Sequence, residues 1–309
     1  MDKQKLIILS GPTAVGKTAI SIGLAHILNG EIISADSMQV YKHMDIGSGK
    51  IKPLEMEGVP HHLIDCLDPR EDFNVKLFKA MAEDAMKGIV NRGRLPIVVG
   101  GTGFYIQAIA YDIAFSEEAD DLAFRKELET EGKEKGKEYL HNRLKELDPK
   151  AAEMIPAGNM KRVIRALEFF HSTGKPISEH NAKERAKPSP YDLRYFVLTL
   201  PRDELYRDIE NRVDSMVAVG LFEEVEKLRE MGVKAGMTSM QGLGYKQAYK
   251  YFDRVYNREE AIEAIKKETR HFAKRQLTWF KREKEAVWVD KGKFNGREEL
   301  ISYIAERCR

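Results

Sequence analysis

The sequence predicts an α/β fold in which helices flank a parallel sheet and an all-helical domain is inserted into the chain. Short apolar runs at residues 6–9, 31–35 and 95–99 are typical of strands buried on both faces, and helical stretches separate them. After these strands the chain becomes strongly charged, with helical periodicity and no strand signal. We therefore expect a core of residues 1–114 and 190–309 and a helical domain of residues 115–189.

The first strand leads directly into a phosphate-binding motif. Residues 11–18 fit the pattern G-x-x-x-x-G-K-[ST], and a predicted helix follows at residues 19–28. The glycines let the backbone N–H groups point inward, Lys17 adds a positive charge, and the Thr18 hydroxyl is placed to hold Mg2+ shared with the phosphates. The core is therefore P-loop NTPase-like, and its ligand is a diphosphate or triphosphate. The residues expected to bind it are Gly11, Pro12, Thr13, Ala14, Val15, Gly16, Lys17 and Thr18.

Two further turns are expected at the edge of the sheet where this motif lies. Asp36 follows the second strand and Thr102 follows the third, and ligands bind at the carboxyl ends of strands in open α/β sheets. The sequence favours two interpretations of Asp36 equally: a group that acts on the ligand, or the N-cap of a helix.

A later helix offers a second positive charge to the ligand. A fourth strand is predicted at residues 195–200, and Arg202 and Arg212 lie on or near the helix that follows it. An arginine in this place is a reasonable clamp on phosphate, although most helix arginines face solvent. A final strand is predicted at residues 287–289.

Composition limits the partners and the compartment. The 51 basic and 49 acidic residues nearly cancel, so a nucleic-acid partner requires a local basic patch. The last long helix is expected to begin with a capping box at Asn257 and Glu260 and to bury Ile262, Ile265, Phe272 and either Trp279 or Phe280. On a different side it carries such a stripe, at Lys267, Arg270, Lys274 and Lys281. The sequence has neither an apolar run of membrane-spanning length nor a signal-peptide pattern, so we expect a cytoplasmic protein without a membrane partner.

The chain also contains a pair of adjacent histidines, His61 and His62. Such a pair suggests a metal site at first sight. Neighbouring residues of a strand point to opposite faces, however, so the two rings cannot easily share one ion. A structural role is the favoured interpretation.

From these residues alone, the expected chemistry is phosphoryl transfer by a small-molecule or nucleotide kinase. Two observations count against the best-known alternatives. No apolar strand ends in a clear Walker-B aspartate, and no N-K-x-D sequence for guanine occurs, which argues against a switch-type GTPase. The kinase remains as one hypothesis.

Several motifs in the chain closely resemble those of tRNA dimethylallyltransferases, a family also called tRNA isopentenyltransferases. The resemblance covers nearly the whole chain in the same order, and it is to the bacterial type, because no zinc-finger extension like that of eukaryotic relatives is found. The motifs are GPTAVGKT at 11–18, DSMQVYK at 36–42, GGTGFYI at 100–106, KRVIRALE at 161–168, IENRVDSM at 209–216 and TRHFAKRQLTWF at 269–280.

The resemblance implies a different reaction from that of a kinase. The phosphate loop would bind dimethylallyl diphosphate, and the dimethylallyl group would pass to N6 of the adenosine 3′ of the anticodon, at position 37 of tRNA, with release of diphosphate. By the same resemblance Asp36 is the catalytic base and Thr102 lies near the substrate nucleotide. Lys17, Arg212 and Mg2+ on Thr18 would stabilise the leaving diphosphate. The protein would act on the anticodon stem-loop as a monomer.

The resemblance further implies a set of positions that contact tRNA. Many relatives carry a basic residue where this chain has Asp208, so an extra phosphate contact from that turn is in doubt. The implied tRNA-binding residues are Asp36, Ser37, Met38, Gln39, Thr102, Arg125, Lys161, Arg162, Val163, Ile164, Arg165, Gln241, Gly242, Leu243, Gly244, Tyr245, Lys246, Arg270 and Lys274.

Overall fold

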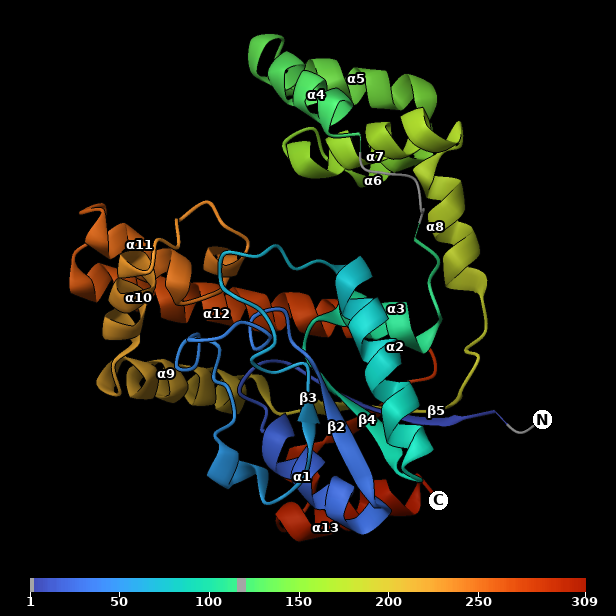
Figure 1. Ribbon diagram of the computed structural model, residues 1–309, viewed down its shortest axis with the longest axis vertical. Helices are drawn as coiled ribbons and strands as arrows, with labels where there is room; N and C mark the ends of the chain where they lie inside the picture. The colour runs from blue at the N-terminus through green and yellow to red at the C-terminus, as the bar shows by residue number, and fades with distance from the viewer. Residues whose placement is uncertain (1–2, 116–120) are drawn as a thin grey trace. The chain divides into compact units, whose positions relative to one another are not determined.

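The computed structural model describes residues 3–115 and 121–309, and the chain divides into two compact units (Figure 1). The core extends to Asp112 and resumes at Ser189, whereas the helical unit is the continuous segment Ile113–Pro188. These bounds lie within two residues of those expected from the sequence. Within the described residues, no helix is both long enough and apolar enough to cross a membrane.

Within the described residues the core contains a six-stranded sheet with the strand order β3-β2-β4-β1-β5-β6. Each neighbouring pair is parallel, so the carboxyl ends of the strands share one edge. The strands are β1 (Lys5–Ser10), β2 (Gly30–Ala35), β3 (His61–His62), β4 (Leu95–Gly100), β5 (Asp192–Thr199) and β6 (Val287–Asp290).

The sheet is buried on both faces, as the continuous apolar runs predict. In β1, Leu6 and Ile8 join one hydrophobic cluster, whereas Ile7 and Leu9 join the cluster on the opposite face. The first cluster includes side chains of α2 (Val75–Asn91) and α3 (Gly103–Ala110). The second includes side chains of α1 (Lys17–Leu28) and α13 (Arg297–Glu306), which lie side by side in Figure 1.

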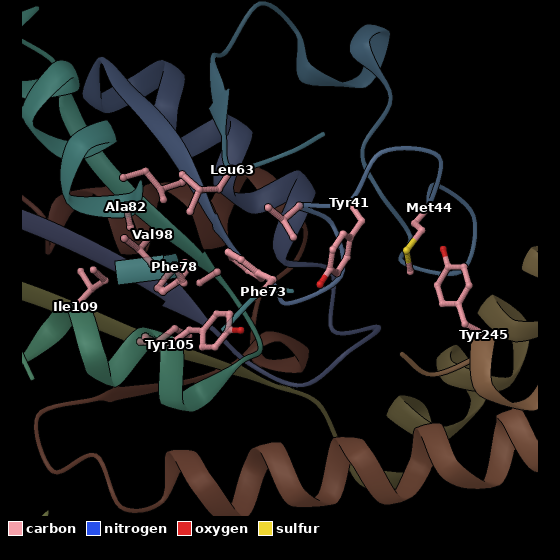
Figure 2. Close-up of a cluster of buried hydrophobic side chains, with 14 of the residues drawn as sticks. Tyr41, Met44, Leu63, Phe73, Phe78, Ala82, Val98, Tyr105, Ile109 and Tyr245 are labelled. Atoms are coloured by element: carbon pink, nitrogen blue, oxygen red, sulfur yellow. The ribbon is translucent and has the colours of Figure 1, made fainter. Parts of the chain in front are cut away.

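An aromatic group within the first cluster fixes the start of α3 (Figure 2). Tyr105 stacks on Phe78 with ring centroids 4.6 Å apart, and Phe73 meets both Tyr105 and Tyr41 edge-on. Buried aromatic pairs of this kind add stability beyond the area that they bury. Because Tyr105 lies one turn after Thr102, this packing also holds the turn between β4 and α3.

The remainder of the core is mostly helical. Asn257 caps α12 and forms a capping box with Glu260, as the sequence predicts. The prediction that Phe272 is buried on α12 is wrong, because Phe272 is only partly buried and Gln276 is buried instead. These helices are α9 (Arg202–Ala218), α10 (Leu221–Glu230), α11 (Tyr245–Phe252) and α12 (Arg258–Phe280), with short 3-10 turns η1 (Pro53–Met56), η2 (Ser239–Gln241) and η3 (Lys291–Lys293).

The helical unit has a hydrophobic core of its own, which includes Leu128, Leu144 and Leu167. On its central helix Val163, Ile164, Leu167 and Phe169 are buried, whereas Met160 and Phe170 are only partly buried. The helices are α4 (Leu122–Glu134), α5 (Lys137–Leu147), α6 (Pro149–Met154), α7 (Met160–Thr173) and α8 (Ile177–Ala186).

The paired histidines serve the sheet. His62 Nε2 lies 2.6 Å from Oε2 of the buried Glu31, and His61 Nδ1 lies 2.8 Å from the Val59 carbonyl oxygen. Arg92 forms two hydrogen bonds to the same carboxylate, and these bonds, together with His62, lower the pKa of Glu31 to about 2 against the opposing effect of burial. The favoured structural interpretation of the pair agrees with these contacts.

Candidate active site

The phosphate loop lies between β1 and α1, as its motif predicts. Gly16 is the residue before α1 and has the left-handed φ of 89°. Gly11 has a φ of 147°, and a methyl group added there would lie 2.7 Å from the Leu198 carbonyl oxygen. Both glycines are therefore required by the backbone, and the loop directs its amides and the positive end of α1 to one place.

Lys17 is the first residue of α1, and its ammonium lies within the loop. Its Nζ donates hydrogen bonds to the carbonyl oxygens of Gly11, at 3.0 Å, and Pro12, at 2.8 Å. Burial, the largest effect, and the charge of Arg212 together lower the pKa of Lys17 to about 7, and the Asp36 carboxylate opposes this shift. The three side chains therefore lie close enough for their charges to interact.

Asp36 follows β2 and caps a turn there; it is not the helix N-cap that the sequence offered as one interpretation, because no helix begins in the described residues directly after it. Its Oδ1 accepts hydrogen bonds from the backbone amides of Met38, at 2.8 Å, and Gln39, at 3.3 Å. In the part of the chain that the structure describes, Oδ2 takes part in no hydrogen bond or ion pair. One oxygen caps the turn, and the other is available to a ligand.

Thr102 lies beside Asp36 because two turns meet. The Thr102 amide donates to the carbonyl oxygen of Ala35, the residue before Asp36, at 3.3 Å. Thr102 is partly exposed, and its hydroxyl does not cap α3. The side chain is therefore placed at the predicted edge, with its hydroxyl available to a ligand.

Arg212, rather than Arg202, is the arginine that belongs to this site. Burial lowers the pKa of the Arg212 guanidinium, and the Asp36 carboxylate opposes that shift. Arg212 packs so closely on Gly49 that a methyl group there would lie 1.8 Å from Nη2, and it lines a cavity of about 590 Å3. Arg202 is exposed and lies over the Tyr206 ring.

Gln276 is a site residue that the sequence analysis missed. It is buried on α12, where its Oε1 accepts a hydrogen bond from the Thr13 amide at 2.9 Å. Its Nε2 donates to the Gly101 carbonyl oxygen at 3.0 Å. One side chain thus ties the phosphate loop to the turn that carries Thr102. A signal existed in the sequence, because Gln276 occupies a helical position in register with the buried Ala273 and Phe280.

Glu224 is a second buried residue that the sequence analysis missed. Its carboxylate accepts hydrogen bonds from the backbone amides of Asp45, Ile46 and Gly47 at 2.8, 2.7 and 3.1 Å. It also accepts one from the Tyr245 hydroxyl at 2.7 Å. The Tyr245 ring is fully buried against Glu224 and beside Met44 (Figure 2), so its side chain is not exposed to a tRNA, and the expected contact from this residue stays a prediction for its backbone.

The other expected tRNA-binding residues of the core differ in what their side chains do. Ser37, Met38 and Gln39 are partly buried, and Gly242 packs so closely on Met38 that a methyl group there would lie 2.7 Å from its Sδ. Arg270 pairs with Glu210 at 2.6 Å. In segment 241–246, Gln241 and Lys246 are exposed and Leu243 is partly exposed. These three residues line a cavity of about 470 Å3 together with Lys250, Lys267 and Arg275. Lys274 is exposed on α12.

In the helical unit, the expected RNA-binding set divides between its surface and its core. Lys161 and Arg162 are exposed on α7, and Arg165 is partly buried. Val163 and Ile164 are buried in the core of the unit, so their side chains are not exposed to a tRNA, and the expected contact from these two residues stays a prediction for their backbone. Arg125 pairs with the buried Glu168, with Nε and Oε1 3.0 Å apart, and lines a cavity of about 420 Å3 between α4 and α7.

The donor set near the phosphate loop fits a magnesium ion that is bound together with phosphate. Among the described residues, no group of three or more His, Cys, Asp or Glu side chains could hold a metal ion by itself. Thr18 is exposed in the first turn of α1, where its hydroxyl oxygen is a suitable ligand. Mg2+ commonly takes one or two protein oxygens and completes its shell with phosphate and water.

Comparison with known protein families agrees with this geometry. Residues 39–283 match the family model described as IPP transferase, and residues 4–67 match the one described as isopentenyl transferase. The chain belongs to the IPP transferase family. This membership sets aside the kinase hypothesis, which the phosphate loop alone had suggested. One relative of this IPP transferase is the tRNA dimethylallyltransferase of Lachnoclostridium phytofermentans, which is 53% identical over 98% of this chain and 97% of the relative.

Solved structures of other proteins share the fold of this IPP transferase. The full-length tRNA isopentenylpyrophosphate transferase from Bacillus halodurans is 44% identical, with a TM-score of 0.73 over 99% of this chain and 97% of that one. The enzyme from Staphylococcus epidermidis is 39% identical, also with a TM-score of 0.73, over 99% of both chains. A eukaryotic dimethylallyltransferase described as acting on tRNA is 28% identical, with a TM-score of 0.79 over 96% of this chain and 78% of that chain.

Proposed function

We propose that this IPP transferase moves a dimethylallyl group from dimethylallyl diphosphate to N6 of adenosine 37, 3′ of the anticodon of tRNA, and releases diphosphate. The 53% identical relative is named for transfer of this group to tRNA. The observation that carries the proposal is the interaction of Lys17, Asp36 and Arg212 at one phosphate loop. It joins an anion-binding group to a carboxylate that is free to accept a proton.

The first part of the chemistry is the activation of the adenine amine. N6 attacks the first carbon of the dimethylallyl group, and the bond from that carbon to the diphosphate oxygen breaks with its electron pair on oxygen. The amine is a weak nucleophile because its lone pair is delocalised into the ring. Asp36 Oδ2 takes the proton that N6 loses, while Oδ1 stays bonded to the Met38 amide.

The second part is the stabilisation of the departing diphosphate. Negative charge accumulates on the oxygen that leaves, next to the loop amides and the N-terminus of α1. The positive charges of Lys17 and Arg212 lie where they stabilise that charge more than they stabilise the bound substrate. Mg2+ bound through Thr18 would supply further positive charge to the same oxygens.

The tRNA substrate must present an unstacked base. Extrusion of adenine costs a few kcal/mol, and less in a loop than in a duplex. Exposed cations for the phosphodiester backbone are present in both units, at Lys161 and Arg162 of the helical unit and at Lys246 and Lys274 of the core. All the residues proposed for the reaction belong to one chain, which supports action as a monomer. A tRNA substrate also supports a location in the cytoplasm.

The test of this proposal is the substitution Asp36→Asn. Asparagine keeps an oxygen that can cap the Met38 amide, so the turn should survive while the proton acceptor is lost. We expect transfer to slow by about 10²- to 10⁴-fold, the usual contribution of a general base. Mass spectrometry of an anticodon stem-loop measures transfer, and calorimetry with inorganic pyrophosphate measures binding, which should change less than about twofold.

The matched control is Asp203→Asn, which alters an exposed carboxylate on α9. It should leave both transfer and pyrophosphate binding unchanged. Normal turnover by the Asp36→Asn protein would remove Asp36 from its proposed role as the base.

A further inference from the structure

A second lysine, Lys291, reaches the phosphate loop from a distant part of the chain. A methyl group added at Gly16 would lie 3.1 Å from Lys291 Nζ and 3.9 Å from its Cε. Gly16 immediately precedes Lys17, in the stretch of the loop whose amides surround a bound phosphate. The ammonium of Lys291 therefore borders the space that the missing side chain of Gly16 leaves open.

The sheet delivers Lys291 to this position. Lys291 follows β6, which pairs in parallel with β5, and β5 pairs in parallel with β1. The end of β6 therefore lies at the same edge as the phosphate loop. Asp290 accepts a hydrogen bond from the Gly292 amide at 3.0 Å, which fixes the short turn that holds Lys291.

The strand order also decides the side from which Lys291 approaches. Asp36 follows β2, which lies two strands from β1 in one direction, and Lys291 follows β6, two strands away in the other. A ligand in the loop would thus have Asp36 on one side and Lys291 on the other.

The charge of Lys291 is not neutralised by the protein. Among the described residues its ammonium takes part in no hydrogen bond or ion pair, and the neighbouring Asp290 carboxylate is bonded to a backbone amide. Lysines with structural roles in this core differ, since Lys50 contacts Asp45 and Asp65, and Lys266 contacts Asp214. An ammonium that borders the N–H donors of the loop can hold an anion together with them.

From these observations we infer that Lys291 is a second lysine contact for the diphosphate group, on the side of the loop away from Asp36. The inference rests on the proposed function of the phosphate loop. Lys17 binds the diphosphate from within the loop. Lys291, at the end of β6, offers it a second ammonium with three N–H donors. Because it touches the leaving group, it strengthens the binding of both the substrate and the released diphosphate.

The experiment measures the binding of inorganic pyrophosphate to the full-length protein by calorimetry, without tRNA. Lys291→Met removes the charge and keeps most of the stem, Lys291→Arg keeps the charge, and Lys293→Met is the control, an exposed lysine in the same 3-10 turn. We expect Lys291→Met to weaken binding about tenfold or more, the loss typical of a charge-assisted hydrogen bond. Lys291→Arg should stay within about threefold of the parent protein and Lys293→Met within about twofold.

The salt dependence supplies a second measurement. Binding by Lys291→Met should depend less steeply on salt concentration than binding by the parent, because one ionic contact is gone, and Lys293→Met should keep the parent dependence. Thermal unfolding midpoints close to that of the parent would show that each variant is folded.

The outcomes separate this inference from the function on which it rests. If the parent binds pyrophosphate and Lys291→Met binds it equally well, Lys291 is no part of the site and the proposed function stands. Equal losses in Lys291→Met and Lys293→Met would also overturn the inference, because net charge alone would explain them. A parent protein that neither binds pyrophosphate nor transfers a dimethylallyl group would contradict the proposed function itself.

Discussion

The protonation of Lys17 should change when an anion binds in the phosphate loop. Its ammonium is bonded to two carbonyl oxygens of its own loop, and its pKa is lowered to about 7, chiefly by burial. A diphosphate in the loop favours the charged form and must raise this pKa. Free protein near neutral pH therefore contains a substantial fraction of uncharged Lys17, and binding drives that fraction to take up a proton.

This linkage predicts proton uptake on pyrophosphate binding above pH 7. Between the lowered pKa of free Lys17 and its higher pKa in the complex, the complex holds more protons than the free protein. The affinity for pyrophosphate should therefore fall as the pH rises through that interval. Well below pH 7, Lys17 is charged in both states, so its proton uptake on binding should vanish. Calorimetry at pH 8 in two buffers of different ionisation enthalpy counts the protons that are taken up.

The control for this prediction is Lys17→Arg, because a guanidinium stays charged at every pH used. Protonation of pyrophosphate itself is common to both proteins and cancels in the comparison. If the two proteins take up equal numbers of protons, Lys17 does not titrate as described.

At the scale of single residues, the sequence was sufficient where the chemistry is local. Gly11, Lys17 and Thr18 are fixed by a motif whose strand and helix context is present in the same short stretch. Asp36 could not be assigned from the sequence, because capping and catalysis favour the same residue at the same place. The structure shows that Oδ1 accepts hydrogen bonds from two backbone amides, and the catalytic role of Asp36 stays a proposal.

Among the elements, α12 makes the most direct connection to the site, through Gln276. Its two hydrogen bonds join Thr13 of the phosphate loop to Gly101 of the turn after β4. The two partners are otherwise held by different strands. Gly101 cannot be replaced without moving this contact, since a methyl group there would lie 2.2 Å from Nε2 of Gln276.

Loss of this connection should affect both stability and transfer. Gln276→Ala leaves the partly buried Thr13 amide and the buried Gly101 carbonyl oxygen without this partner, at a cost of about 1–3 kcal/mol in the free energy of unfolding. We also expect a lower kcat, because the turn that carries Thr102 is no longer held against the phosphate loop. Urea unfolding measures the first effect, and steady-state transfer at a temperature where the variant is folded measures the second.

The control on the same helix is Thr278→Ala, which removes an exposed hydroxyl bonded only to the Lys274 carbonyl oxygen. It should change neither quantity appreciably. A Gln276→Ala protein that is destabilised but transfers at the parent rate would limit Gln276 to a structural role.

At the scale of elements, apolar patterning predicted the strands but not every buried position on the helices. Phe272 was expected to be buried because it is apolar, yet the buried positions of α12 include Gln276, whose polar groups both find partners. Tyr245 was expected in an exposed loop, but its partner Glu224 lies 21 positions away in the chain. Pairings between separate elements leave no periodic signal in one sequence.

For the whole molecule, we predict how the affinity for tRNA depends on exposed cations of the two units. If one tRNA contacts Arg162 of the helical unit and Lys246 of the core, each substitution by alanine removes one phosphate contact. The slope of the logarithm of affinity against the logarithm of salt concentration should then become shallower, by about one unit for each phosphate contact that is removed. The losses in the double variant should multiply, because the two sites share no contacts.

Filter binding of an anticodon stem-loop between about 50 and 200 mM salt measures these slopes. Lys150→Ala is the control, since it removes an exposed charge of the helical unit from α6 instead of α7. If Lys150→Ala weakens binding as much as Arg162→Ala does, the unit attracts RNA through net charge alone.

Among the large-scale features, the division of the chain into two units was the easiest to predict from the sequence, because the composition changes at each boundary. The role of the helical surface was less accessible. Val163 and Arg162 are adjacent in one motif, and only packing shows that the first belongs to the interior of the unit and the second to its surface.

The helical unit enters the chain after Asp112 and leaves it before Ser189, whereas the phosphate loop, Asp36, Thr102 and Arg212 all belong to the core. Substitutions confined to that one continuous segment can therefore alter the surface of the helical unit without changing any residue of the sheet or of the phosphate loop. On the proposed function, evolution could adjust tRNA recognition within a single stretch of the gene and keep the residues proposed for the chemistry.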